Sequence, residues 1–172
     1  LRTDPGCRVV LYDRPGTGAH ATGGSLAGAS AALHTMLREH ELAPAIVVGQ
    51  SLGGAAALLL ARDHPEDVAG LVLLDPSAVN DVTLAKATES MARVSDLAWR
   101  IPLFRKPIAS GLRTRAEKLA DRHEMRSDCR SAIVRTAELD LPRLRQASDG
   151  LAALAKDFQE SDLPRVPSVV VT

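Results

Sequence analysis

Aromatic side chains are nearly absent from this chain of 172 residues, because phenylalanine, tryptophan and tyrosine together make up only 2%. Such scarcity argues against a surface that stacks on nucleic-acid bases or sugars. The formal net charge is zero, so the total charge gives no sign of a nucleic-acid or membrane partner. With 45% hydrophobic and 24% charged residues, the composition is that of an ordinary soluble globular protein. Its core must be built from leucine, valine and alanine.

Cysteine and long apolar runs are also scarce. The two cysteines, Cys7 and Cys129, fit no metal-ligand spacing and are too few for a disulfide framework, so we expect two reduced thiols. No apolar run approaches the ~20 residues of a membrane span, and no signal peptide is recognisable. A cytoplasmic location is the default expectation. The chain begins at Leu1 rather than Met, and we expect its natural beginning to lie further upstream.

Short apolar runs alternate with helical periodicity over the first 78 residues. The runs are CRVVLY at 7–12, AIVVG at 45–49 and GLVLLD at 70–75. Continuous runs of this kind predict parallel strands that are covered on both faces. Between them the spacing predicts one helix from Ser25, its N-cap, to about Leu42, and a second from Ala55 to His64. The order indicates βαβ units, and therefore an α/β fold with a mostly parallel sheet and flanking helices.

After Ser77 the chain changes character. Residues 79–165 have helical periodicity, no valine-rich run, and expected breakers at Pro102, Pro107, Gly111, Pro142 and Gly150. This segment carries 16 Lys/Arg and 13 Asp/Glu, whereas residues 1–78 carry 5 and 8, so a mildly basic helical segment follows a mildly acidic one. We interpret the charges as solvated helix faces with i,i+4 pairs. Attraction of an anionic substrate or surface is the alternative.

One serine lies between glycines at the end of the second predicted strand. The pattern G-x-S-x-G is formed by Gly49, Gln50, Ser51, Leu52 and Gly53. A serine at a sharp strand-to-helix turn adopts a strained backbone, and we expect both glycines to relieve crowding there. The N–H of Leu52, at the start of the next helix, would face an oxyanion formed at the serine. This context favours a nucleophile over a glycine-rich turn with an incidental serine, and no phosphate-loop pattern surrounds it.

Four stretches of the chain follow one another in a recognisable order. They are YDRPGTG at 12–18, VVGQSLGG at 47–54, GLVLLDPS at 70–77 and VPSVVVT at 166–172. They resemble, in turn, the loop before the elbow helix, the nucleophile elbow, the following strand and the strand after the lid in the α/β-hydrolase superfamily. The branch that they resemble comprises the lid-bearing esterases, lipases and peptidase-like members.

The resemblance implies one incomplete α/β-hydrolase domain over residues 1–172. Its parts would be a sheet core with the elbow at 1–78, a helical lid at 79–165 and a returning core strand at 166–172. In this family the acid typically follows the strand after the lid and the histidine follows one strand later, so both are expected beyond Thr172. The second oxyanion donor is expected before Leu1.

Within the chain, two residues are candidates for completing a triad with Ser51. His20 follows a loop at the same sheet edge and is the best local candidate for the base. For each of the other four histidines we favour a surface or packing role. Asp75 ends the strand after the elbow strand, where some superfamily members have their acid. The alternative for Asp75 is a structural carboxylate that caps the turn at Pro76.

Other residues have plainer interpretations. Asp13 and Arg14 are interpreted as residues that fix their loop, and Gln50 is expected near the pocket floor. The apolar stretch of the lid segment is expected to be core packing rather than a substrate wall. That stretch contains Leu97, Trp99, Ile101, Leu103 and Phe104.

These observations predict a serine hydrolase that cleaves an ester, amide or thioester of a small apolar substrate through an acyl-enzyme on Ser51. No metal or organic cofactor is implied, and the substrate is the expected partner. Two alternatives stay open: a non-catalytic or truncated relative, and an acyltransferase that uses the same serine. For the isolated chain we expect negligible activity and low stability, because strand edges would lie unpaired. The oligomeric state is not predicted.

Overall fold

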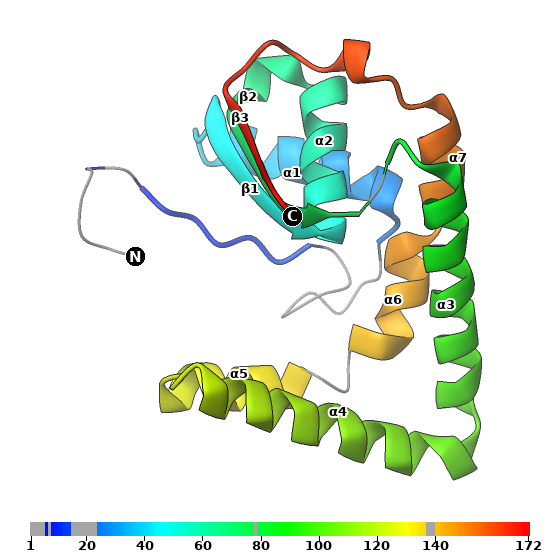
Figure 1. Cartoon of the computed structure of the whole chain (residues 1–172). Helices are drawn as coiled ribbons and strands as arrows, with labels where there is room; N and C mark the ends of the chain where they lie inside the picture. The colour runs from blue at the N-terminus through cyan, green and yellow to red at the C-terminus, as the bar shows by residue number, and fades with distance from the viewer. Residues whose placement is uncertain (1–5, 7, 15–23, 78, 137–139) are drawn as a thin grey trace.

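The computed structural model describes residues 6, 8–14, 24–77, 79–136 and 140–172. The elements in chain order are α1 (Leu26–Glu39), β1 (Ala45–Ser51), α2 (Leu52–Asp63), the 3-10 turn η1 (Pro65–Asp67), β2 (Val68–Pro76), α3 (Val82–Arg100), α4 (Pro102–Arg122), α5 (Ser127–Thr136), α6 (Asp140–Ser148), α7 (Leu151–Asp157), η2 (Glu160–Asp162) and β3 (Ser168–Val171). Figure 1 shows the strands gathered at one end and the helices α3 to α7 beside and below them. None of the described helices is both long and apolar enough to cross a membrane.

A parallel sheet carries the fold, as the alternation of strands and helices predicts. The described strands lie in the order β1-β2-β3, and both neighbouring pairs are parallel. Val48 pairs with Val72, which pairs in turn with Val169. The carboxyl ends of all three strands therefore meet at one sheet edge, where an α/β protein places its functional residues.

Among the described residues, helices cover only one face of this sheet, so the expectation that both faces are covered is wrong for this part of the chain. Helix α2 packs on β1 and β2, and α1 packs on α2. On the other face Ile46 and Val48 are 69% and 63% exposed. Strand β3, at the end of the strand order, is exposed on both of its faces. The reason is that the helices of residues 79–165 pack largely on one another beside the sheet, and in Figure 1 no described helix lies across from α2.

The predicted strand at 7–12 is also absent from the part of it that is described. Residues 8–12 have no strand conformation, and Leu11 is 94% exposed. A strand needs a neighbouring strand to complete its hydrogen bonds. Strand β1 has β2 on one side, and no described strand lies on its other side. The apolar composition of this run was therefore insufficient to define its structure.

The two helices of the βαβ unit match their predictions in kind and differ at their ends. Ser25 caps α1, because its side chain accepts a hydrogen bond from the N–H of Gly28. Helix α1 ends at Glu39 rather than near Leu42. Helix α2 begins at Leu52, three residues before the expected start, so it follows Ser51 without a connecting residue. That direct succession creates the sharp turn at the serine.

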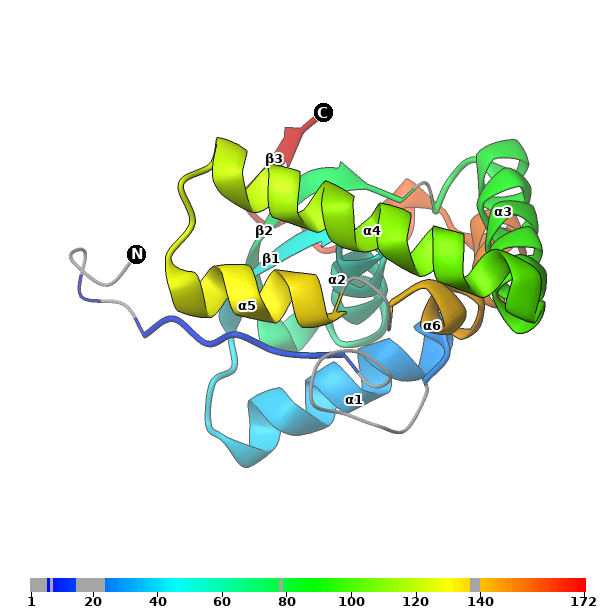
Figure 2. The same cartoon turned by 90° about the horizontal axis from the view of Figure 1, so that it is seen from below.

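The segment 79–165 is helical, as expected, but three of its predicted breakers lie inside helices. Pro107 and Gly111 are both within α4. Pro142 is the third residue of α6. Pro107 lacks an N–H and therefore removes one intrahelical hydrogen bond. The other hydrogen bonds of this 21-residue helix keep it intact. Helices α4 and α5 run side by side in both views (Figures 1 and 2) and pack mainly against each other and α3.

The apolar stretch around Trp99 does not form a core, which corrects the expectation. Leu97 is 61% exposed and Leu103 is 78% exposed, and Phe104 is exposed as well. Trp99 itself is half-buried, with the guanidinium of Arg105 lying 5.3 Å from its ring centroid. The physical reason is that α3 leads away from the sheet and α4 turns back below it (Figure 1), so no described element forms a packing layer over these side chains.

Asp96 on α3 joins α3 to α6. Its carboxylate is 2.9 Å from Arg145 Nη1 and 3.1 Å from Arg100 Nη2, and the residue is buried. The hydrogen bond from Arg145 lowers the pKa of Asp96 below its ordinary value of 3.8. Burial raises this pKa and opposes part of the shift, and the contact with Arg100 lowers it further. The charged form of Asp96 is therefore the form that the fold stabilises.

We predict that Asp96→Asn lowers the free energy of unfolding at neutral pH by on the order of 1 kcal/mol, because both arginines are largely exposed and solvent screens the pair. A lowered folded pKa means that this stabilisation is present above the unfolded value and is lost as the pH falls through the folded value. The difference between wild type and Asp96→Asn should therefore shrink below about pH 4. Urea unfolding at neutral pH and at pH 3 measures it, and an equal difference at both pH values would contradict the assignment.

Candidate active site

Ser51 occupies a strained backbone conformation at the junction of β1 and α2. Its φ is 50° and its ψ is −122°, a region that residues other than glycine rarely adopt. The residue is exposed. Strain of this kind persists only where the surroundings enforce it, and it is concentrated at functional sites. The sharp turn predicted around this serine is therefore present.

The turn is held tight by backbone contacts that exclude side chains. A Cβ added to Gly49 would lie 2.4 Å from the carbonyl oxygen of Gly53, and one added to Gly54 would lie 2.7 Å from Cβ of Pro76. Both distances are shorter than real Cβ contacts, so glycine is required at both positions. A Cβ on Gly53 would meet nothing within 4 Å. The expectation that Gly53 relieves crowding through its missing side chain is wrong: its backbone creates the crowding, and Gly49 avoids it.

The end of β2 lies against this turn. Ser51 is paired with Pro76 across a register shift, and the N–H of Ser77 donates to the carbonyl of Ser51 at 3.0 Å. The hydroxyl oxygens of Ser51 and Ser77 are 3.5 Å apart. Asp75 lies within the irregularity, with φ of 42° and an exposed side chain. Thus Asp75 and Ser77 lie at the same edge as the serine, as the ends of parallel strands require.

The first turn of α2 follows Ser51 directly. Leu52 is its first residue, and Ser51 makes no side-chain cap to this helix end. The first N–H groups of a helix have no intrahelical acceptor, and they carry the positive end of the helix dipole. A negative charge that develops on a group bound at Ser51 would be stabilised there. The geometry thus suits Leu52 for the predicted role of oxyanion donor. Gln50, the residue before Ser51, is exposed.

The histidines lie elsewhere in the described part of the chain. His34 and His64 stack on each other with ring centroids 3.8 Å apart, and His64 follows the end of α2 that is opposite to Ser51. His40 and His123 are exposed at the ends of α1 and α4. Among the described residues, no hydrogen bond joins Ser51 to a histidine. His20, the candidate base, lies outside the described residues.

Ser77 is the neighbour that the sequence did not single out. It follows the strand next to the elbow strand, and its hydroxyl is the hydrogen-bonding neighbour of the Ser51 hydroxyl. The signal was present in the chain as the polar residue directly after GLVLLDP. What the sequence alone did not supply was the strand register that brings the two serines together.

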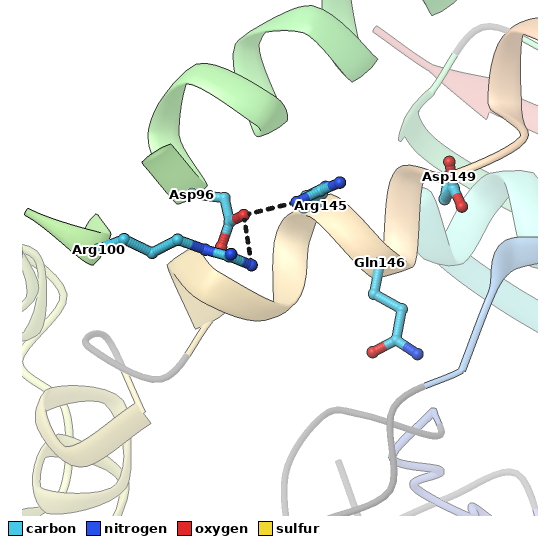
Figure 3. Close-up of a pocket in the computed structure, with 5 residues that line it drawn as sticks. All are labelled: Asp96, Arg100, Arg145, Gln146 and Asp149. Atoms are coloured by element: carbon cyan, nitrogen blue, oxygen red, sulfur yellow. Dashed lines mark hydrogen bonds and ion pairs between the residues drawn. The ribbon is translucent and has the colours of Figure 1, made fainter. Parts of the chain in front are cut away.

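A pocket of about 280 Å³ lies away from these residues, between α3 and α6 (Figure 3). It is lined by Asp96, Arg100, Arg145, Gln146 and Asp149. In Figure 3 the two arginines converge on Asp96. Their charges are therefore engaged within the protein, and none of the residues predicted for the site lines this pocket.

Comparisons with known proteins identify the family of this chain. The model of the family described as "Alpha/beta hydrolase family" matches residues 1–172. The chain belongs to the alpha/beta hydrolase family. The resemblance inferred from its motifs is confirmed, and so is the α/β fold class with a parallel sheet and flanking helices.

Individual relatives of this alpha/beta hydrolase are distant or match only a part of it. It is 48% identical to the lipase LipV of Mycobacterium tuberculosis over 50 residues, which cover 29% of this chain and 19% of the lipase. A thermophilic esterase from Thermogutta terrifontis superposes with a TM-score of 0.64 at 20% identity, over 92% of this chain and 58% of the esterase. A hydrolase from Pseudomonas aeruginosa gives a TM-score of 0.53 at 17% identity, over 93% and 69%. These structural matches support the fold, and this chain spans a little over half of the esterase.

We predict opposite effects for alanine at two glycines of the elbow. Gly49→Ala should lower the free energy of unfolding by about 1–3 kcal/mol, because the new Cβ would overlap the backbone of Gly53. Gly53→Ala is the matched control, since it adds the same methyl group where nothing is crowded, and helix propensity favours alanine by up to ~1 kcal/mol. Urea unfolding of both variants measures the difference. An equal loss of stability in the two variants would contradict this assignment of the crowding.

Proposed function

We propose that this hydrolase-family protein cleaves an ester, amide or thioester of a small, largely apolar substrate by forming an acyl-enzyme on Ser51. The observation that carries the proposal is the strained, exposed Ser51 directly before the first turn of α2. A glycine would adopt this conformation without strain. A serine kept there supports a use for its hydroxyl.

In the proposed reaction, Ser51 Oγ attacks the carbonyl carbon and its proton passes to a general base. The tetrahedral oxyanion accepts hydrogen bonds from the N–H of Leu52 and from a second donor. As the carbonyl re-forms, the bond to the leaving alcohol, amine or thiol breaks, and the base returns the proton to that group. Water then attacks the acyl-enzyme by the same route and releases the acid and free Ser51.

The base and the acid of this reaction are part of the proposal. The family resemblance implies a histidine and an acid beyond Thr172 and a second oxyanion donor before Leu1. Asp75 is kept as the acid candidate within the chain, because it lies at the same sheet edge as Ser51. Ser77 Oγ, 3.5 Å from Ser51 Oγ, is suited to hold the Ser51 hydroxyl in position before the base engages it.

An apolar substrate is supported by the exposed apolar side chains around the junction of α3 and α4. Leu97, Leu103 and Phe104 on α3 and α4 lack a packing partner layer, and charged groups are not required to bind an acyl chain. The esterase and lipase relatives agree with this chemistry by analogy.

We predict that Ser51→Ala reduces hydrolysis of p-nitrophenyl butyrate by the native-length protein at least about 10³-fold, because both the nucleophile and the acyl-enzyme are lost. Ser90→Ala is the matched control, since Ser90 is exposed on α3 and should leave the rate unchanged. The rate of p-nitrophenol release is measured by its absorbance, at several protein concentrations, for wild type and both variants. Equal rates for Ser51→Ala and wild type would overturn the proposal, and ester formation with an added alcohol would assign the same serine to acyl transfer.

A further inference from the structure

A second cluster of chemically active side chains lies at the end of α2 that is remote from Ser51. His34 on α1, His64 after α2, and Glu66 and Asp67 in η1 each offer a ligand atom, and these atoms all lie within 4.8 Å of one another. The elements that carry them are brought together by the packing of α1 on α2 and of α2 on η1. The serine at the other end of α2 is 13 positions from His64, or ~20 Å along a helix, so the cluster is separate from the proposed active site.

The anchor of the cluster is Asp67, whose side chain is completely buried. One carboxylate oxygen, Oδ2, is 2.6 Å from Nδ1 of His34. The other, Oδ1, makes no hydrogen bond of good geometry, although Arg38 Nη2 lies 2.5 Å away as an ion-pair partner. A buried carboxylate is costly unless it is paired, and here Arg38 and His34 supply the pairing. Asp67 therefore fixes the positions of the side chains around it.

The contact between Asp67 and His34 prepares the imidazole as a ligand. An ionised carboxylate accepts a hydrogen bond, so Nδ1 of His34 carries the proton in this contact. In the neutral ring Nε2 then has a free lone pair. Histidines that bind metals commonly donate their other ring N–H to a carboxylate, which fixes the tautomer and raises the basicity of the ligand nitrogen. The contact between His34 Nδ1 and Asp67 has this form, and it leaves Nε2 as the nitrogen that could bind an ion.

The remaining groups complete a donor set and leave a negative charge to be balanced. His64 Nδ1 is 3.9 Å from Glu66 Oε1, and Arg38 Nη2 is 3.6 Å from the same oxygen. If both imidazoles are neutral, the carboxylates of Glu66 and Asp67 carry two negative charges, and Arg38 balances one of them. Two imidazole nitrogens and carboxylate oxygens are the donors that zinc and similar divalent transition ions prefer.

We infer that His34, His64 and Glu66 bind a divalent transition-metal ion of the zinc class, with Asp67 holding His34 in its ligating tautomer. Arg38 stays paired with Asp67 and keeps that carboxylate in place. The side chains of His64 and Glu66 are 27% and 55% exposed, so they can adjust to the ion. One imidazole must turn out of the present stack, since ring lone pairs lie in the ring plane and the stacked rings are nearly parallel.

Binding at this site would be structural rather than catalytic. The ion would connect α1 to the turn between α2 and β2, which are otherwise joined there by side-chain ion pairs. A ligand that binds the folded state alone stabilises it by mass action. Metal binding and hydrolysis at Ser51 can therefore be measured separately. A variant that loses the metal should keep the proposed hydrolysis.

The test is equilibrium dialysis of the untagged protein against Zn²⁺, with bound zinc measured by atomic emission. We expect about one Zn²⁺ per wild-type chain and binding weakened by more than about tenfold in His34→Ala, His64→Ala and Glu66→Gln. His40→Ala and His123→Ala are matched controls, because both histidines are exposed outside the cluster, and they should bind as wild type does. The Tm of wild type should rise with Zn²⁺ and fall back with a chelator.

Circular dichroism establishes that each variant is folded before its binding is measured. Glu66→Gln decides the matter if a histidine variant unfolds, because Glu66 is exposed and its loss removes a ligand without opening the core. Zinc binding that is equally strong in wild type, His64→Ala and Glu66→Gln would overturn the inference. So would an absence of zinc-dependent change in the Tm of the wild-type protein.

Discussion

The contact between Gly49 and the backbone of Gly53 is the constraint on which the rest of the candidate site depends. A strand that enters a helix with no connecting residue must reverse direction within one residue, and that residue is Ser51. The reversal is possible only because Gly49 has no Cβ to meet the carbonyl of Gly53. Gly54 then allows α2 to pass against Pro76 on the neighbouring strand. The strain at Ser51 is thus the consequence of two close backbone approaches, each of which requires a glycine.

Packing on one side of the sheet fixes these approaches in place. Leu59, Leu60 and Leu71 are almost fully buried between α2 and the sheet, so α2 cannot move away from β2 without exposing the core. The hydrogen bond from Ser77 N–H to the Ser51 carbonyl connects the same two elements at the edge. By contrast, α4 and α5 pack mainly on neighbouring helices. The rigid part of the molecule is therefore the part that carries the serine.

The sequence was sufficient for the features that depend on neighbouring residues. The order of apolar runs predicted the parallel sheet, Ser25 was recognisable as a cap, and the G-x-S-x-G pattern placed the turn at Ser51. It failed where structure depends on a distant partner. The run at 7–12 has strand composition, yet residues 8–12 lie beside no described strand, and Ile46 and Val48 face outward because the helices pack elsewhere.

Distant pairing also explains what the sequence left unnoticed at the two sites. Ser77 lies 26 positions from Ser51, and only the strand register brings their hydroxyls together. His34 and Asp67 are 33 positions apart and meet because α1 packs on α2. His34 and His64, each taken alone, were interpreted as packing or surface residues. A carboxylate buried beside two imidazoles becomes visible only once the helices are placed.

The claim that the strained turn presents Ser51 as a nucleophile is tested most directly by locating a covalent adduct. The native-length protein is treated with a fluorophosphonate, digested with trypsin, and its peptides are mapped by tandem mass spectrometry. We predict a single phosphonylated residue, Ser51, in the peptide between Arg38 and Arg62, and no adduct in the heat-unfolded protein. An unmodified Ser51 in folded protein, or equal labelling before and after unfolding, would contradict the account.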